Sequence, residues 1–322
     1  MTSPALYSPL MYKQRYENLP VTLEDGSTVT VSVHKYVNAG LAQFHNSAAR
    51  NTFLAKLNST GVDIELRVDS GNGAQTVGAP ALNNVPLFSR YVFAGKGAPE
   101  HCQIVLQLAD HWNLAPQGLQ AYADAALGLD CNGFVGNYLW HIIDERPWSE
   151  MGQDHTDGPD TGISGYFDKR KKISRFGEMK QGRCYILGRT DAGGTVIDKV
   201  AGGDAAHIAI TEPGLSGNAM SRSVDPDFTL EDGPLTWGFR PSHLRTSSRP
   251  GPLGSQGPVL ADPGLDAVYI VESTASARQP GLSASWYRLK GTSKHGKIGV
   301  FDLYRESMAV HQRLLFQIAE VG

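Results

Sequence analysis

The sequence contains few cysteines, and their spacing excludes two common uses of this residue. Cys102, Cys131 and Cys184 are the three cysteines among 322 residues, and no two of them form a CxxC pair. An odd, scattered set does not make a disulfide framework and lacks the ligand spacing of a zinc site. We therefore expect reduced thiols, and we expect neither a metal nor another cofactor.

Long apolar runs and an excess of one charge are also missing. No stretch approaches the roughly 18 apolar residues of a membrane span. The N-terminus, MTSPALYSPLMYKQRYENLP, has neither the basic nor the apolar region of a secretory signal. The net charge of −3 and the pI near 6.4 give no basic footprint for nucleic acid or an anionic membrane. We expect a protein that is cytoplasmic when made, although export by a signal-independent route would leave the same features.

The first part of the chain, residues 1–95, mixes short helix and strand signals, and its role is unknown. A loop-like stretch at its end, SGNGAQTVGAPALNNVP, marks a candidate boundary. We therefore divide the chain into an N-terminal α+β segment, 1–95, and a second domain, 96–322. In the first segment the patterns predict a hairpin, a helix and a strand, over 21–33, 41–57 and 62–68.

The second domain shows helical patterns first and strand patterns afterwards. The predicted helices cover 102–112, 116–127 (with Pro116 in the first turn) and 128–143, and a polar loop follows over 144–175. Period-two strands are predicted over 182–189, 194–200, 205–211, 267–274, 283–289 and 297–304. A long insertion rich in Pro, Gly and Ser separates the third and fourth strands at 212–266, and an amphipathic helix is predicted over 305–321. This order favours the α+β class, with helices packed on an antiparallel sheet.

Cys131 stands at the predicted start of a helix, in GLDCNGFVGNYLW. A helix N-terminus stabilises a thiolate through its N–H groups and its macrodipole. Asp130 or Asn132 could cap this helix, Gly133 would let a substrate approach the backbone, and the Cys131 N–H could stabilise an oxyanion. The alternative is a buried structural cysteine. We interpret Cys102 and Cys184, which lie in apolar runs, as core residues.

A catalytic cysteine needs a base, and His207 is the strongest of ten histidines. It opens the strand AAHIAIT, where alanines leave room for a helix end. His141 follows Cys131 on the same predicted helix and would lie roughly 15 Å from it, so His141 is too distant to be the base. Glu272, inside the apolar strand AVYIVEST, could orient the imidazole, and alternation places it on one face with Val268 and Ile270. The alternatives are a hydrogen-bonded core histidine and a solvent-exposed glutamate at a strand end.

These residues resemble a family. DCNGFV is similar to the Asp-Cys-Ser-Gly-Phe-Val signature of NlpC-type cysteine peptidases, in the papain-like superfamily. AAHIAIT resembles their histidine motif, FGEMKQGRCYIL the strand before it, and VYIVEST the strand of the orienting residue. The resemblance covers roughly residues 100–305. It departs from the family at Asn132, at Arg183, and at Glu272, which stands after a long insertion where the family most often has a nearby histidine.

The resemblance implies a papain-like fold with an N-terminal extension, and a cysteine hydrolase that cleaves amide bonds in peptidoglycan stem peptides. Cys131, His207 and Glu272 would form the catalytic triad, while Asp130, Gly133 and the family's helper tyrosine, for which Tyr122 is the nearest candidate, would support the oxyanion. A peptide or peptidoglycan is the expected partner, and an inhibitor or immunity protein is a further candidate. A lysin or an exported effector would fit the lack of a signal. The alternatives are a deamidase, acyltransferase or lipid amidase, and a non-catalytic binding module on a degenerate scaffold.

Overall fold

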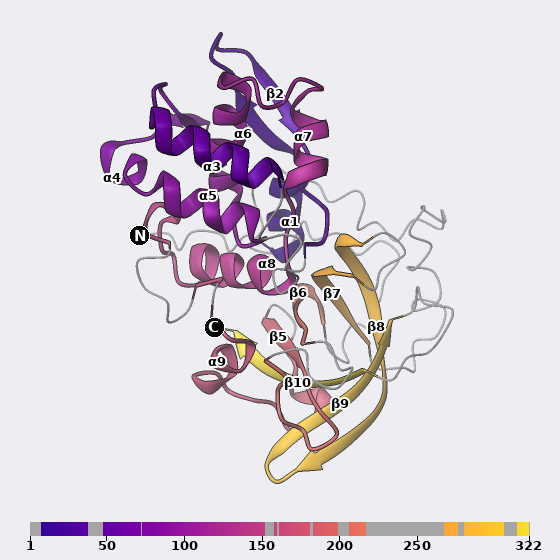
Figure 1. The fold of residues 1–322 in the computed structure, drawn as a ribbon. Helices are drawn as coiled ribbons and strands as arrows, with labels where there is room; N and C mark the ends of the chain where they lie inside the picture. The colour runs from indigo at the N-terminus through magenta and orange to yellow at the C-terminus, as the bar shows by residue number, and fades with distance from the viewer. Residues whose placement is uncertain are drawn as a thin grey trace. The chain divides into compact units, whose positions relative to one another are not determined.

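A computed structural model describes most of the chain outside the long insertion (Figure 1). The described residues are 8–37, 48–71, 73–151, 158–159, 161–180, 183–198, 206–216, 267–275, 280–305 and 314–321. Both helices and strands are present, so the predicted α+β class is confirmed. Among these residues, no helix is long and apolar enough to cross a membrane.

The chain divides into two compact units, each built from more than one stretch of sequence. The helical unit comprises Tyr12–Thr161 and Ser273–Leu282, and the barrel unit comprises Met1–Met11, Gly162–Glu272 and Ser283–Gly322. The boundary expected near residue 95 falls inside the helical unit, between two of its helices.

The helical unit is organised around α6, Pro99–His111, whose residues 99–109 are all buried. A helix that is buried on every side lies in the centre of its unit. The other helices of this unit are α3 (Ala48–Thr60), α4 (Ala79–Leu82), α5 (Val85–Phe93), α7 (Leu119–Ala126) and α8 (Cys131–Tyr138), while α1 (Pro9–Glu17) begins in the barrel unit. Two antiparallel pairs, β1 (Leu19–Thr22) with β2 (Thr28–Val31) and β3 (Arg67–Asp69) with β4 (Ala74–Thr76), complete it.

Within the described residues, the strands of the barrel unit form a closed barrel in the order β10-β5-β6-β7-β8-β9. Strand β10 pairs antiparallel with β5 and β9, and the pairs β5–β6, β6–β7 and β8–β9 are also antiparallel. The strands are β5 (Cys184–Arg189), β6 (Ile208–Ser216), β7 (Ala267–Thr274), β8 (Gly281–His295), β9 (Ile298–Arg305) and β10 (Leu314–Val321), and α9 (Ile163–Asp168) precedes them.

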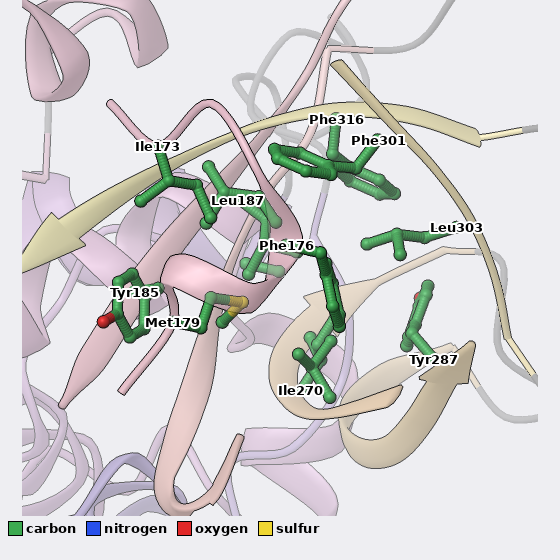
Figure 2. Packing of buried hydrophobic residues seen from close by; sticks show 13 residues of the cluster. Ile173, Phe176, Met179, Tyr185, Leu187, Ile270, Tyr287, Phe301, Leu303 and Phe316 are labelled. Atoms are coloured by element: carbon green, nitrogen blue, oxygen red, sulfur yellow. The ribbon is translucent and has the colours of Figure 1, made fainter. Parts of the chain in front are cut away.

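Alternate residues of the strands fill the barrel with apolar side chains (Figure 2). On β7, Val268 and Ile270 belong to this core, which fits the two-residue period of a strand. The short helical turn η3 (Phe176–Glu178) contributes Phe176 from outside the strands. The core comprises Ile173, Phe176, Met179, Tyr185, Leu187, Ala209, Val268, Ile270, Tyr287, Phe301, Leu303, Phe316 and Ile318.

The end of the chain differs from the sequence-based expectation. The helix predicted over 305–321 is wrong for Leu314–Val321, which form strand β10. This strand pairs with β5 on one side and β9 on the other. Phe316, which Figure 2 shows, and Ile318 both belong to the core, at the two-residue spacing of a strand. Pairing on both edges therefore overrides the local helical pattern.

Several local predictions also need correction. Residues 194–198 form no strand: Gly194 (φ 82°) follows a turn, and Val196 makes a single bridge to Thr190. Pro116 precedes α7, which begins at Leu119 after Gly118 (φ 93°). The strand expected over 62–68 is reduced to β3, the stretch 70–86 contains β4 and α4, and the loop 144–175 contains α9. The insertion lies outside the described residues from 217 to 266.

Candidate functional site: a capped helical cysteine and a histidine–glutamate pair

Cys131 is the first residue of α8, as the sequence pattern predicts. Asp130 is the N-cap: its backbone is extended (φ −86°, ψ 170°), and its side chain accepts a hydrogen bond from the Gly133 N–H. Lys96 Nζ lies 2.8 Å from the other carboxylate oxygen of Asp130. The thiol therefore stands at the positive end of a helix whose cap is itself held by an ion pair.

The turn before Cys131 packs closely against Gly95. The Gly95 carbonyl accepts a hydrogen bond from the Asp130 N–H (3.0 Å). A side chain at Gly133 would overlap this same carbonyl oxygen. Gly133 is therefore needed for packing within the helical unit, and the space in which we expected a substrate is filled by Gly95.

Asn132 does not cap the helix. Its Nδ2 donates to the carbonyl of Thr161 at 2.6 Å. Its Oδ1 is buried and has no hydrogen-bond partner among the described residues. Asn132 thus links the first turn of α8 to Thr161, 29 residues later in the chain.

The structure identifies a tyrosine beside the cysteine that sequence reasoning missed. Tyr36 forms a parallel bridge with Leu129, two residues before Cys131. Burial raises the pKa of Tyr36, and negative charge on a Cys131 thiolate or on Asp130 raises it further. Tyr122, the expected helper, lies on α7, and burial alone raises its pKa. Nothing in the sequence around Tyr36 signals this proximity, because the two stretches are 95 residues apart.

Burial alone does not distinguish the three cysteines, none of which forms a disulfide. Cys131 and Cys184 are each 7% exposed, and Cys102 is 1% exposed. Burial, and then the charge of Glu100, raises the pKa of Cys102, which opposes thiolate formation there. What sets Cys131 apart is its position at a capped helix N-terminus.

His207 and Glu272 are joined directly in the barrel unit. His207 precedes β6 and Glu272 lies on β7, and the imidazole Nε2 is 2.5 Å from the carboxylate Oε2. The His207 side chain is 14% exposed and that of Glu272 is 1% exposed. The imidazole is therefore near the surface of the unit and its carboxylate partner is in the interior.

Two further side chains hold the other oxygen of Glu272. The Tyr287 hydroxyl donates to Oε1 at 2.7 Å, and the Arg305 guanidinium donates to the same atom. Burial raises the pKa of Glu272, but the charge of Arg305 and the hydrogen bonds from His207 and Tyr287 outweigh it and lower the pKa to about 2. Glu272 is thus a buried carboxylate that stays ionised and can stabilise an imidazolium.

Arg305 and Tyr287 were not predicted, although the sequence contains a signal for Arg305. Phe301 and Leu303 point into the core, and alternation along β9 places Arg305 on the same face. A charged residue on an apolar face needs a partner of opposite charge, which is the argument that singled out Glu272. Applied to β9, it would have found Arg305.

The candidate residues belong to both units. Cys131, Asp130, Gly133, Tyr122 and Tyr36 lie in the helical unit, and His207 and Glu272 lie in the barrel unit. Ser273, the residue after Glu272, belongs to the helical unit. Its hydroxyl donates a hydrogen bond to the Leu129 carbonyl at 2.7 Å.

His141 lies on the π-helix η1 (Leu139–Ile143) that continues α8, and its Nδ1 is 4.0 Å from a Glu100 oxygen.

The described residues contain no group of three side chains suited to a metal ion. We compared the chain with protein-family models, curated proteins and solved structures, and none of them matches.

Proposed function

We propose that the protein is a cysteine hydrolase that cleaves amide bonds, with Cys131 as nucleophile, His207 as base and Glu272 as orienting residue. The observation that carries the proposal is the His207–Glu272 pair. Burying an ionised glutamate costs desolvation free energy. Glu272 is nevertheless buried, and its Oε2 contacts the imidazole of His207, which is partly exposed. The cysteine at a capped helix N-terminus adds support.

In the proposed first step, His207 removes the proton of the Cys131 thiol and the thiolate attacks the carbonyl carbon of the substrate. A C–S bond forms, and the carbonyl oxygen gains negative charge. Because Nε2 of His207 faces Glu272, Nδ1 is the nitrogen that would exchange this proton. Glu272 stabilises the resulting imidazolium.

The second step releases the amine and then the acid. The C–N bond breaks as the imidazolium returns its proton to the leaving nitrogen, and a thioester remains on Cys131. Water, deprotonated by His207, attacks the thioester and breaks the C–S bond. The Cys131 N–H and the Tyr36 hydroxyl are the proposed donors to the oxyanion, since both belong to the surroundings of the thiol.

The substrate class rests on the resemblance to NlpC-type peptidases and is proposed accordingly. The substrate would be the stem peptides of peptidoglycan, and the protein would act on them as an endopeptidase or as an amidase. The protein would be made in the cytoplasm and would act on the cell wall after signal-independent export or as a lysin, with an inhibitor or immunity protein as a candidate partner. Other acyl substrates, in deamidation, acyl transfer or lipid amide hydrolysis, would use the same residues.

The test is to incubate purified peptidoglycan with the wild-type protein and to analyse the soluble fragments by mass spectrometry. We expect new stem-peptide fragments, and we expect Cys131→Ala and His207→Ala to release none. Cys184→Ala is the matched control, because it removes a thiol of the same exposure and should retain activity. Labelling with iodoacetamide should modify Cys131 first, and His207→Ala should slow that reaction.

The outcomes separate the candidate functions. Labelling that depends on His207 without peptidoglycan cleavage would indicate a hydrolase or transferase for another acyl substrate. Peptidoglycan binding that survives Cys131→Ala, with no difference in labelling among the three cysteines, would support the non-catalytic binding module.

The two tyrosines form a second matched pair. Tyr36→Phe should lower kcat by about ten- to a thousandfold if its hydroxyl stabilises the oxyanion. Tyr122→Phe should leave kcat unchanged, because burial alone raises the pKa of Tyr122, whereas Cys131 also acts on the pKa of Tyr36. The reverse result would restore Tyr122 as the helper tyrosine.

A further inference from the structure

The barrel unit carries a concentration of positive charge that the net charge of the whole chain conceals. The sequence KRKKISR, residues 169–175, follows α9 and includes five basic residues. Within it, Lys171 and Arg175 are exposed and Lys172 is half-buried. The hairpin of β8 and β9 adds Lys294 and Lys297, which are also exposed.

Backbone pairing brings these two stretches together. Residues 171–173 run beside the barrel: the Glu320 N–H donates to the Lys171 carbonyl (2.9 Å), and the Gly299 N–H donates to the Ile173 carbonyl (3.1 Å). Gly299 is in turn the cross-strand partner of Lys294. The segment and the hairpin therefore form one surface, which we call the basic surface and define as Lys171, Lys172, Arg175, Lys294 and Lys297.

Glu178 and Glu320 lie beside this surface but have partners outside it, although the charge of Lys171 adds to the hydrogen bonds from Ser174 in lowering the pKa of Glu178. Glu178 accepts a hydrogen bond from Ser174 (2.6 Å), and a Glu320 oxygen lies 3.9 Å from Arg183. In the part of the chain that the structure describes, no ion pair joins a carboxylate to any of the five basic residues. Five like charges on adjacent backbone segments repel one another, and an anionic partner would relieve that repulsion.

The composition of the surface indicates what kind of anion it fits. Four of its five cations are lysines, which bind phosphate as flexible point charges rather than as a rigid fork. Residues 169–175 and 290–298 contain no Phe, Tyr or Trp. These two stretches therefore lack the aromatic rings that stack nucleic-acid bases and the Trp, Phe and Leu side chains that insert into a bilayer.

We propose that the basic surface of the barrel unit binds a linear polyanion that carries phosphate groups. Binding is electrostatic, with the charges of the polymer spread over the five cations. This binding is independent of the proposed hydrolase reaction, because it uses none of the residues assigned to that reaction.

The test measures binding of long-chain inorganic polyphosphate to the full-length protein over a series of salt concentrations. Each cation that neutralises a phosphate contributes roughly 0.7–0.9 to the slope of log K against log salt. We expect Lys294→Gln with Lys297→Gln to reduce that slope by about 1.5 and to weaken binding on the order of tenfold at low salt. Lys171→Gln with Arg175→Gln should act in the same way.

The matched control is Lys56→Gln with Arg90→Gln, which removes the same charge from the helical unit and should leave binding unchanged. Thermal unfolding of each variant checks that the fold is retained. The proposal is overturned if polyphosphate does not bind at low salt, on the order of 50 mM. It is also overturned if the control variant Lys56→Gln with Arg90→Gln weakens binding as much as the variants of the basic surface do. Equal binding of monomeric phosphate, or preferential binding of phosphatidylglycerol vesicles or duplex DNA, also overturns it.

Discussion

The imidazole of His207 and the carboxylate of Glu272 lie 2.5 Å apart, and the same carboxylate receives the buried guanidinium of Arg305. Glu272 therefore interacts with two basic groups at once. The charge of Arg305 keeps Glu272 ionised, and the ionised carboxylate can stabilise a positive charge on His207 near the surface of the barrel unit. The pair is both a structural element and the proposed orienting element of catalysis.

Glu272→Ala should destabilise the protein by about 3–5 kcal/mol, because it leaves the buried Arg305 without a counter-ion. The measurement is urea unfolding at pH 7. Glu272→Leu combined with Arg305→Met should recover much of the lost stability, since it replaces the ion pair with apolar groups. That double variant should still lack hydrolase activity. A single variant within 1 kcal/mol of wild type, on the order of a surface ion pair, would show that Arg305 is satisfied elsewhere.

His101 provides a pH-dependent test of the helical unit. The Ala98 N–H donates to its Nδ1 (3.2 Å), its Nε2 faces the Trp148 carbonyl (3.0 Å), and the ring stacks on Phe88. This arrangement requires the neutral imidazole with its proton on Nε2. Burial lowers the pKa of His101 to about 4, against the opposing charge of Glu100.

Because the unfolded chain binds the His101 proton more tightly than the folded protein, stability should rise with pH between about 4 and 6.5. The measurement is the urea midpoint as a function of pH. His101→Gln keeps an acceptor at the third position of α6, and should flatten the profile in this window. An unchanged slope in that variant would assign the titration to another group.

Gly133→Ala should disrupt the turn that carries Cys131, since the new Cβ would overlap the Gly95 carbonyl oxygen. We expect a loss of about 1–3 kcal/mol, as for overpacking elsewhere. Gly291→Ala is the control, because no atom lies within 4 Å of a Cβ at that position. Equal stability of the two variants would mean that the turn can shift to accept a methyl group.

Local sequence patterns predicted those parts of the fold in which local and tertiary preferences agree. The start of α8 was predicted from Asp130 and Cys131, and the burial of Glu272 with Val268 and Ile270 from strand alternation. Strand β10 was predicted as a helix, because one of its two partners, β5, is remote in the sequence and only the closed barrel reveals that pairing.

The candidate site, like the fold, was predictable from the sequence only where its residues carry a local signal. Cys131, His207 and Glu272 each carry a local signal, and the contact between His207 and Glu272 follows from the pairing of neighbouring strands. Tyr36 carries no such signal, since it approaches Leu129 only after the helical unit has folded. Side chains brought together by tertiary contacts alone are beyond the reach of periodicity.

Glu212 should make the barrel unit respond to pH in the direction opposite to His101. Its side chain is fully buried on β6, one oxygen accepts from the Leu10 N–H (3.0 Å), and the other has no hydrogen-bond partner among the described residues. Burial raises the pKa of Glu212 to about 7, although hydrogen bonds from Leu10 and Ser8 act to lower it.

Because the folded protein holds this proton more tightly than the unfolded chain, the contribution of Glu212 to stability is present below pH 4.5 and declines as the pH rises to about 7. Glu212→Gln keeps the shape and the acceptor for Leu10 without a charge. It should therefore be more stable than wild type at pH 8, with the difference disappearing near pH 4.5. Urea unfolding at the two pH values measures this, and His101→Gln serves as the control, because its profile should change only between about 4 and 6.5. If Glu212→Gln is equally destabilised at both pH values, Glu212 is ionised in the native protein and a cation must lie beside its second oxygen.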